Sequence, residues 1–229
     1  DGSGADISGT GNTADLEAGT PFAPGRFADA LDQRLDLKDV RVPAAAPGLA
    51  ALEPARLTLS AWVNRSGDPG GSRFLVAKGG QEPCNAQNEA NPSYALATDE
   101  SGDLVFMTYD ASFLSATRSP AKTGAAVFDG QWHSVVGVYD GVKTRLYVDG
   151  TQVGDGANGT GAIAYGLGQR ALTIGSFPVA SCPGHFPALI DDVRVYNRAL
   201  GDADVAELAR GETPVPPVGP PPVQPPINT

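Results

Sequence analysis

The sequence predicts an all-β fold, namely a sandwich of two antiparallel sheets with one short C-terminal helix. Short runs in which apolar residues alternate with polar ones recur about every ten residues along the chain. The stretches between these runs are rich in turn-forming residues, and the chain contains 29 glycines and 20 prolines. No long segment has the apolar spacing of an amphipathic helix. We expect one β-sandwich over residues 1–212, since single all-β domains of this length are common.

The strands are predicted from alternation about one buried face. In "RLTLSAWVN" (residues 56–64) every second position is apolar, which is typical of a half-buried strand. The buried positions are expected to be Leu57, Leu59, Ala61 and Val63. Further strands are predicted at 73–79, 93–110 (two strands around the turn "DESGD"), 132–139, 144–148, 170–177 and 187–197.

The one helix is predicted in "GDADVAELARG" (residues 201–211). Asp202 is expected to be its N-cap, Val205 and Leu208 to share its buried face, and Gly211 to end it. The final stretch, "TPVPPVGPPPVQPPINT" (residues 213–229), is dominated by proline and favours an extended polyproline conformation. It is predicted to be a linker or tail, so that the sandwich is one module of a larger multidomain chain. A docking site for proline-reading domains is the less favoured alternative.

The charge of the chain excludes one class of partner. The formal net charge is −10 and the pI is about 4.5, whereas nucleic-acid binding needs clustered Lys and Arg. No apolar run approaches the roughly 20 residues of a membrane span, so we expect a soluble chain without membrane insertion.

The two cysteines, Cys84 and Cys182, both lie in polar segments that read as loops. An even count in such surroundings favours a disulfide, and a disulfide favours an extracellular or cell-surface location. Two unrelated free thiols are the alternative. A zinc site is not expected, since no C-x-x-C or H-x-x-x-H spacing is present.

Three motifs carry a resemblance to a known family. They are "DGQWHSVVGVYDGVKTRLYVDG" (129–150), "LTIGS" (172–176) and "IDDVRVYNRALGDADVAEL" (190–208). In this order they resemble the laminin-G-like family, whose fold is a concanavalin A-like jelly roll, and "DISGTGN" (6–12) resembles an early motif of that family. The family usually has a strand before the "DGSG" stretch that opens this sequence, so we expect an edge strand to be missing or supplied differently.

The resemblance implies a structural calcium site formed by the early and late acidic segments. The expected ligands are Asp6, Gly9 (through its carbonyl), Asn12 and Asp191, because calcium takes six to eight oxygens from loops of this kind. Alternation would place Asp191 inward with the valines at 193 and 195, where an unpaired carboxylate is costly. Asp192 would then face Arg194 or solvent. The alternative is that Asp191 only accepts hydrogen bonds from a loop.

A ligand-binding patch is predicted beside the cysteines. If the two cysteines are bonded, their loops must be neighbours and form a surface rich in amides and edged by aromatic rings. The candidate residues are Asn85, Gln87, Asn88, Asn91, His185 and Phe186. The alternative is that the amides cap turns and the aromatic rings plug the end of the sandwich.

No arrangement of acids typical of catalysis is apparent. Trp132 and His133 lie in a predicted strand and are interpreted as structural, with Trp132 covering core and His133 lacking a Ser, Cys or Asp partner in sequence. No acids are spaced as glycan hydrolysis requires. The resemblance therefore implies a non-catalytic extracellular module that binds a polysaccharide or other glycan. A protein-binding adhesion or spacer module, with a cell-surface protein as its partner, is the alternative, and a glycan-cleaving enzyme is a remote one.

Overall fold

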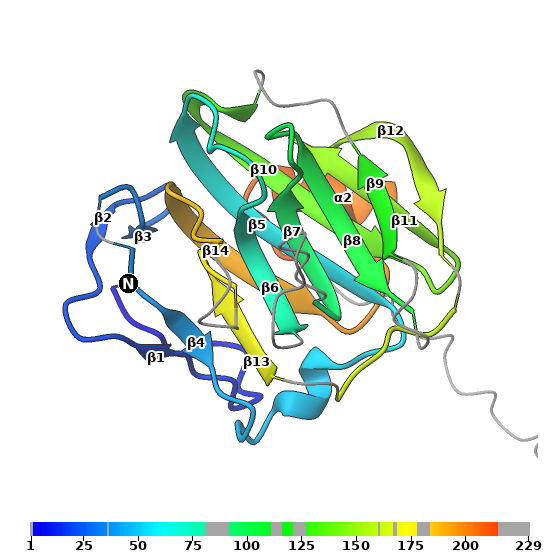
Figure 1. Cartoon of the computed structure of the whole chain (residues 1–229), viewed down its shortest axis with the longest axis horizontal. Coiled ribbons are helices and arrows are strands. Elements are labelled where there is room, and N and C mark those ends of the chain that lie inside the picture. The colour runs from blue at the N-terminus through cyan, green and yellow to red at the C-terminus, as the bar shows by residue number, and fades with distance from the viewer. Residues whose placement is uncertain are drawn as a thin grey trace, which may run out of the picture.

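Two antiparallel sheets face each other in the computed structural model (Figure 1). The structure describes residues 2–35, 37–80, 92–110, 116–120, 127–159, 161–166, 169–177 and 184–214. Sheet A contains, in spatial order, β1 (Asp15–Leu16), β4 (Val40–Val42), β13 (Gln169–Ile174), β6 (Phe74–Gly80), β7 (Tyr94–Thr98), β8 (Leu104–Tyr109) and β9 (Ala116–Pro120). Sheet B contains β12 (Thr151–Asn158), β11 (Lys143–Val148), β10 (Asp129–Tyr139), β5 (Leu57–Ser66), β14 (Leu189–Tyr196), β3 (Asp29–Asp32) and β2 (Phe22–Pro24).

The core lies between the sheets, as the alternation of β5 predicts. The four apolar residues expected to be buried on β5 all belong to one core cluster and are at most 1% exposed. They pack with side chains of the facing sheet such as Leu75, Leu96 and Phe106. The predicted all-β sandwich is therefore confirmed, and each strand predicted at 56–64 and beyond has a counterpart.

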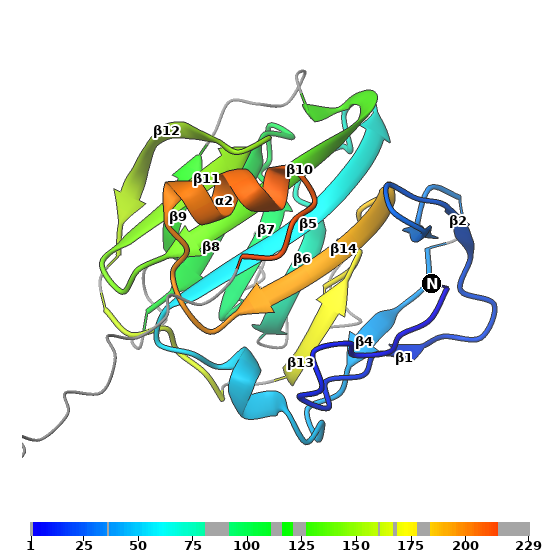
Figure 2. The ribbon, with the colours of Figure 1, turned by 180° about the vertical axis from the view of Figure 1, so that it is seen from behind.

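A single helix, α2 (Asp202–Ala209), covers the outer face of sheet B among the described residues (Figure 2). Val205 and Leu208 are buried against it, as predicted. The predicted N-cap is wrong by one residue, because Gly201 occupies that position without a side-chain cap. Asp202 is instead the first helical residue and accepts a hydrogen bond from Tyr147 Oη (2.8 Å). This hydrogen bond and burial together raise the pKa of Tyr147 to about 12, with burial the larger cause.

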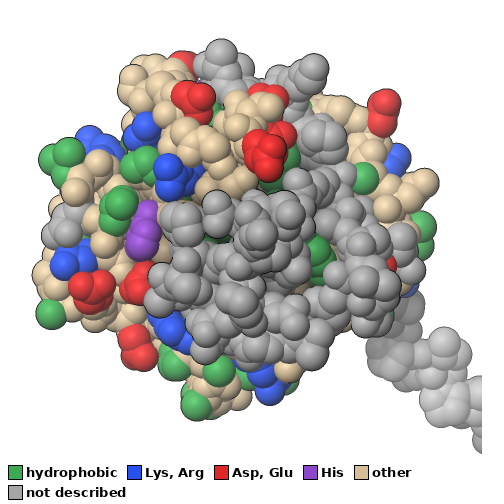
Figure 3. Space-filling view, in the orientation of Figure 1, with side chains coloured by type: hydrophobic (Ala, Val, Ile, Leu, Met, Phe, Trp, Pro, Cys, Tyr) green, Lys and Arg blue, Asp and Glu red, His purple; other side chains and the backbone are tan. Residues whose placement is uncertain are grey.

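The N-terminal segment occupies one end of the sandwich, beside β3 and β4 (Figure 1). A 3₁₀ helix, η1 (Leu49–Leu52), then leads into β5. Acidic and basic side chains are interspersed over the described part of the sheet A face (Figure 3). None of the helices in the described ranges is long and apolar enough to cross a membrane.

Candidate functional site

An open groove lies at the end of the sandwich that carries the N-terminal segment. It encloses about 800 Å³. Among the described strands, β3 pairs with β14 only at Leu189 and Ile190, and the rest of β14 pairs with β5 alone. We call this feature the edge groove, because it runs along a bare strand edge. Its lining includes the apolar residues Leu31, Val40, Val42, Leu172, Ile174 and Val193 and the polar residues Asp6, Thr10, Asn12, Asp29, Asp191 and Asp192.

Asp6 is held by hydrogen bonds from its own loop. Its Oδ1 accepts from Ser8 N (2.9 Å) and Ser8 Oγ (2.6 Å), and its Oδ2 accepts from Thr10 Oγ1 and Asn12 N (both 2.8 Å). Desolvation raises the pKa of Asp6, but the hydrogen bonds outweigh it and hold that pKa well below its usual range. They also occupy the lone-pair sites of the carboxylate, so Asp6 can ligate a cation only by exchanging some of these bonds.

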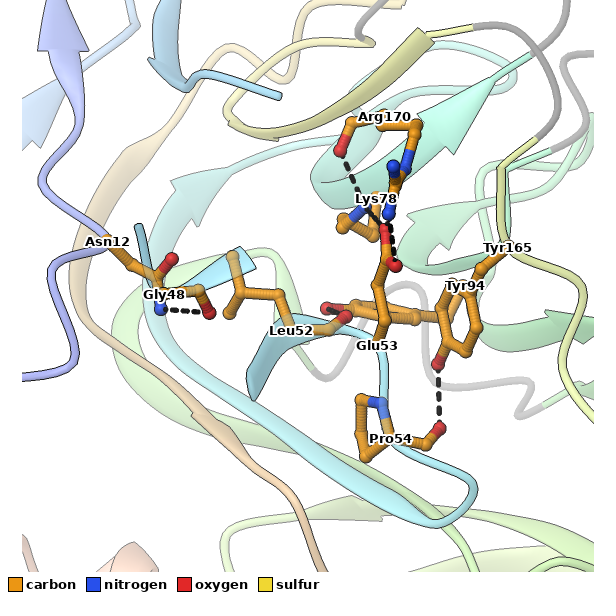
Figure 4. Close-up of polar contacts among 9 residues, drawn as sticks. All are labelled: Asn12, Gly48, Leu52, Glu53, Pro54, Lys78, Tyr94, Tyr165 and Arg170. Atoms are coloured by element: carbon orange, nitrogen blue, oxygen red, sulfur yellow. Dashed lines mark hydrogen bonds and ion pairs between the residues drawn. The ribbon is translucent and has the colours of Figure 1, made fainter. Parts of the chain in front are cut away.

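Asn12 offers an oxygen that the loop does not use. Its Nδ2 donates to Gly48 O (3.1 Å, Figure 4) and to Thr10 Oγ1 (2.9 Å). Its Oδ1 is buried and accepts no hydrogen bond from any described residue. An amide oxygen in this state suits a hard cation such as calcium. Gly9, by contrast, is exposed with a φ of 77° and does not line the edge groove.

The expectation that Asp191 points inward together with Val193 and Val195 is wrong. A β-bulge interrupts the pairing of β14 with β5 after Asp191, and Asp192 there has a positive φ of 49°. The extra residue shifts the alternation. Val193 and Val195 pack against the core, whereas Asp191 lies directly opposite Trp62, outside the core cluster.

Both acidic residues of the bulge have partners within the protein. Asp191 Oδ2 accepts hydrogen bonds from the backbone N–H groups of Arg26 (2.8 Å) and Phe27 (3.1 Å). Asp192 forms an ion pair with Arg194 (Oδ1–Nε 2.8 Å), as predicted, although burial raises the pKa of Asp192. Asp191 thus anchors a loop by accepting its hydrogen bonds, as expected in the alternative in which Asp191 binds no metal. The structure brings Asp6, Asn12 and Asp191 to one groove, but among the described residues the carboxylates of Asp6 and Asp191 share no hydrogen-bond partner.

The predicted ligand patch lies mostly outside the described residues. Cys84, Cys182, Asn85, Gln87, Asn88 and Asn91 are all among the residues that the structure does not describe. Of the remaining two residues, His185 is partly exposed, with its Nε2 3.4 Å from Asp39 Oδ1. Phe186 is fully buried and packs against Phe128 in the core, so it offers no surface to a ligand.

His133 has two carboxylate partners that sequence spacing did not reveal. Its Nδ1 lies 2.7 Å from Asp149 Oδ2 and its Nε2 3.1 Å from Asp129 Oδ1. Both ring nitrogens are therefore engaged, which supports a structural role. Trp132 lies opposite Asn64, is only half-buried and belongs to no described core cluster, so the expectation that it covers core is wrong.

A buried ion cluster joins η1 to sheet A (Figure 4). Lys78 is 1% exposed, and its Nζ donates to Glu53 Oε1 (3.0 Å) and to the carbonyl of Arg170. Glu53 also receives two hydrogen bonds from the Arg170 guanidinium. Burial lowers the pKa of Lys78. Sequence reasoning missed this cluster because Glu53 and Arg170 are 117 residues apart.

Two tyrosines secure the same segment (Figure 4). Tyr94 Oη donates to Leu52 O (3.0 Å), and Tyr165 Oη donates to Pro54 O (2.8 Å). Burial raises the pKa of both phenols, so they stay protonated and act as donors. Together with the ion cluster, these hydrogen bonds hold residues 52–54 in place, which is a structural role. We call this set of interactions the latch.

Comparison with known proteins identifies relatives of the fold. A family model described as the concanavalin A-like lectin/glucanases superfamily matches residues 39–206. No curated protein matches the sequence. Domain 4 of AbnA, an extracellular arabinanase from Geobacillus stearothermophilus in complex with arabinotriose, has a TM-score of 0.64 at 16% identity, covering 90% of this chain and 93% of that one.

Two further structures match only part of their own length. The Trypanosoma rangeli sialidase has a TM-score of 0.56 at 19% identity, covering 86% of this chain and 29% of that one. The binding domain of Paraclostridial Mosquitocidal Protein 1 has a TM-score of 0.59 at 17% identity, covering 90% of this chain and 49% of that one. At these identities the similarity shows the fold.

Proposed function

The chain belongs to the laminin-G-like part of the concanavalin A-like lectin/glucanase superfamily, and from this premise we propose that it is a non-catalytic module that binds carbohydrate. The observation that carries the proposal is the match to the arabinanase domain. That domain is covered along 93% of its length, comes from an extracellular enzyme and was solved with arabinotriose. A rigid sandwich with loops at its ends is a suitable scaffold for such recognition.

The acids at the edge groove favour binding over catalysis. Glycan hydrolysis needs one carboxyl group that carries a proton and a second that is free to act as base or nucleophile. Asp6 is held ionised by four hydrogen bonds, Asp191 anchors a backbone loop, and Asp192 is paired with Arg194. Each of these three carboxylates already serves the fold, and Asp29, the remaining acidic residue among the described groove lining, is a lone carboxylate rather than the pair that hydrolysis needs.

A protein-binding adhesion role is the alternative, and the bare edge of β14 favours it. An extended peptide can pair with such an edge while its side chains enter an apolar groove. A glycan array decides between the two functions. Retention of the protein by a defined set of glycans supports carbohydrate binding, whereas a blank array contradicts it. Incubation with the retained polysaccharides, followed by an assay for reducing ends, should show no cleavage.

We extend the proposal to a stabilising calcium ion at the edge groove. The described residues contain no ready-made cluster of three or more acidic, His or Cys side chains for a metal. The buried Asn12 Oδ1 offers one oxygen ligand, and Asp6 and Asp191, which line the same groove, would have to exchange hydrogen bonds to supply others. The expected donors are Asp6, Asn12 and Asp191. An extracellular location is proposed as well, since the predicted disulfide would persist in that environment.

Calcium should raise the melting temperature of the wild-type chain. At 100 times the dissociation constant the gain is about 2.7 kcal/mol, because calcium binds only the folded state. Asp6→Asn and Asp191→Asn should abolish this gain, while Asp155→Asn, an exposed change on β12, should preserve it. An identical melting temperature in calcium and in chelator would contradict the site.

A further inference from the structure

An exposed cation and an exposed aromatic ring lie side by side on the outer side of sheet B. The Arg26 guanidinium carbon is 4.8 Å from the centroid of the Trp62 ring and 5.4 Å from that of Phe27. The Phe27 ring stands at 90° to the indole, with centroids 5.7 Å apart. Phe27 is 49% exposed, whereas Trp62 is only 6% exposed. Trp62 therefore forms a base on which Arg26 and Phe27 present their outer surfaces to solvent.

The surrounding backbone holds this pair in a fixed position. Asp191 Oδ2 accepts hydrogen bonds from the N–H groups of Arg26 and Phe27, so the loop is anchored at both residues. A Cβ on Gly25 would lie 2.5 Å from that carboxylate oxygen. A Cβ on Gly211 would lie 2.6 Å from the Phe27 ring. The chain thus approaches the pair closely on two sides, which limits the rearrangement needed on binding.

The Arg26 side chain has no acidic partner within the described residues. The chain contains 26 acidic and 16 basic residues, so acidic partners are plentiful. Most of the described arginines form an ion pair with one of them. Ion pairs are made by Arg34, Arg145, Arg170, Arg194, Arg198 and Arg210. The guanidinium of Arg26 instead stacks on a ring, an arrangement that leaves the N–H groups at its edge available to donate.

We propose that Arg26 and Phe27 form a subsite for a carboxylate-bearing sugar, such as a uronic acid residue of a polysaccharide. This inference rests on the proposed carbohydrate-binding function and specifies the class of glycan. The guanidinium forms a bidentate, charge-assisted hydrogen bond with the sugar carboxylate. The exposed Phe27 ring packs against the apolar face of the same or the neighbouring sugar.

The test uses two probes, oligogalacturonate and its methyl ester, in which each carboxylate is replaced by a neutral ester of the same sugar; both are titrated calorimetrically against the full chain. The wild type should bind oligogalacturonate more tightly than the ester. Arg26→Gln should weaken binding of the acid at least about tenfold and leave the ester unchanged. Phe27→Ala should weaken both. Arg56→Gln is the matched control. Arg56 is likewise exposed and unpaired among the described residues, but it lies beside Gly141 in the turn between β10 and β11 rather than beside Phe27.

The outcomes separate this subsite from the wider function. Equal affinity for acid and ester, or equal effects of Arg26→Gln and Arg56→Gln, overturns the subsite. A glycan array that retains the protein only on neutral sugars also overturns it, while carbohydrate binding stands. A blank array removes the proposed function and the subsite with it. Unchanged melting temperatures of the variants confirm that each comparison is made on folded protein.

Discussion

At the residue scale, His133 joins two neighbouring segments of the chain through both of its ring nitrogens. It bridges the start of β10 at Asp129 and the turn after β11 at Asp149. Burial lowers the pKa of His133, but the two carboxylate hydrogen bonds outweigh it and raise that pKa above its usual value. Asp149 holds this position with a φ of 50°, a conformation that aspartate and asparagine tolerate better than most residues.

The His133 bridge should make stability depend on pH. An unfolded histidine has a pKa of about 6.5, so the bridge contributes fully below about pH 6.5 and is lost as pH rises through the higher folded pKa. The difference in unfolding free energy between wild type and His133→Gln should therefore shrink between about pH 5 and about pH 8.5. Asp149→Asn, which keeps the turn but removes a charge, should reduce this pH dependence. A difference that stays constant across the range would contradict the bridge.

Glu53 matters because Lys78 is buried beside it. Removing the negative charge with Glu53→Gln leaves a buried ammonium ion without its counter-ion, and should lower the free energy of unfolding by about 3–5 kcal/mol. Glu17→Gln is the matched control, since the Lys38–Glu17 pair has a similar length of 3.2 Å but its side chains are 22% and 50% exposed, so its loss should matter little. Denaturant titration measures both changes, and equal losses would contradict the latch.

At the element scale, β10 and β8 approach each other closely through a glycine. A Cβ on Gly137 of β10 would lie 2.2 Å from the ring of Phe106 on β8. Gly137→Ala should therefore destabilise the protein by about 1–3 kcal/mol through overpacking. In a Phe106→Leu background the same change should cost less, because the smaller side chain leaves room. A double-mutant cycle measured by chemical denaturation checks this, and purely additive losses would exclude the contact.

The longer central strands could be predicted from sequence, whereas the short strands β1 to β4, the strands β9 and β12, and local irregularities could not. Alternation on β5 identifies Leu57 to Val63 correctly, because a two-residue period needs only neighbouring positions. The same rule fails on β14, where one extra residue at the bulge reverses the direction of Asp191. Asp192, a non-glycine residue with positive φ, gives no sequence signal of this conformation.

Much of the candidate site depends on contacts between distant segments. Asp6, Asn12 and Asp191 are predicted calcium ligands; the structure shows that all three line one groove, and their role as ligands stays a prediction. The sequence does not reveal that Asp191 supports Arg26 and Phe27, because those residues lie 164 or more positions away. Arg26 and Phe27 can be recognised as candidate binding residues only from the fold, which packs their side chains against Trp62.

At the scale of the whole molecule, the predicted disulfide remains to be measured. A bond between Cys84 and Cys182 would close a loop of about 100 residues and contribute up to about 4.7 kcal/mol in the chain-entropy model. Denatured protein should show no reactive thiol before reduction and two after it. The reduced protein should unfold at lower denaturant concentration. Two reactive thiols in the unreduced chain would contradict the bond.

The unpaired side of β14 has a practical consequence for work with this module in isolation. Within the part of the chain that the structure describes, β14 beyond Ile190 pairs with a strand on one side only, and such an edge beside an apolar groove is a template on which another polypeptide can add. At high concentration the protein is therefore expected to self-associate first through the β14 edge. Any fusion partner or immobilisation tag is best attached elsewhere, so that it neither covers nor occupies this edge.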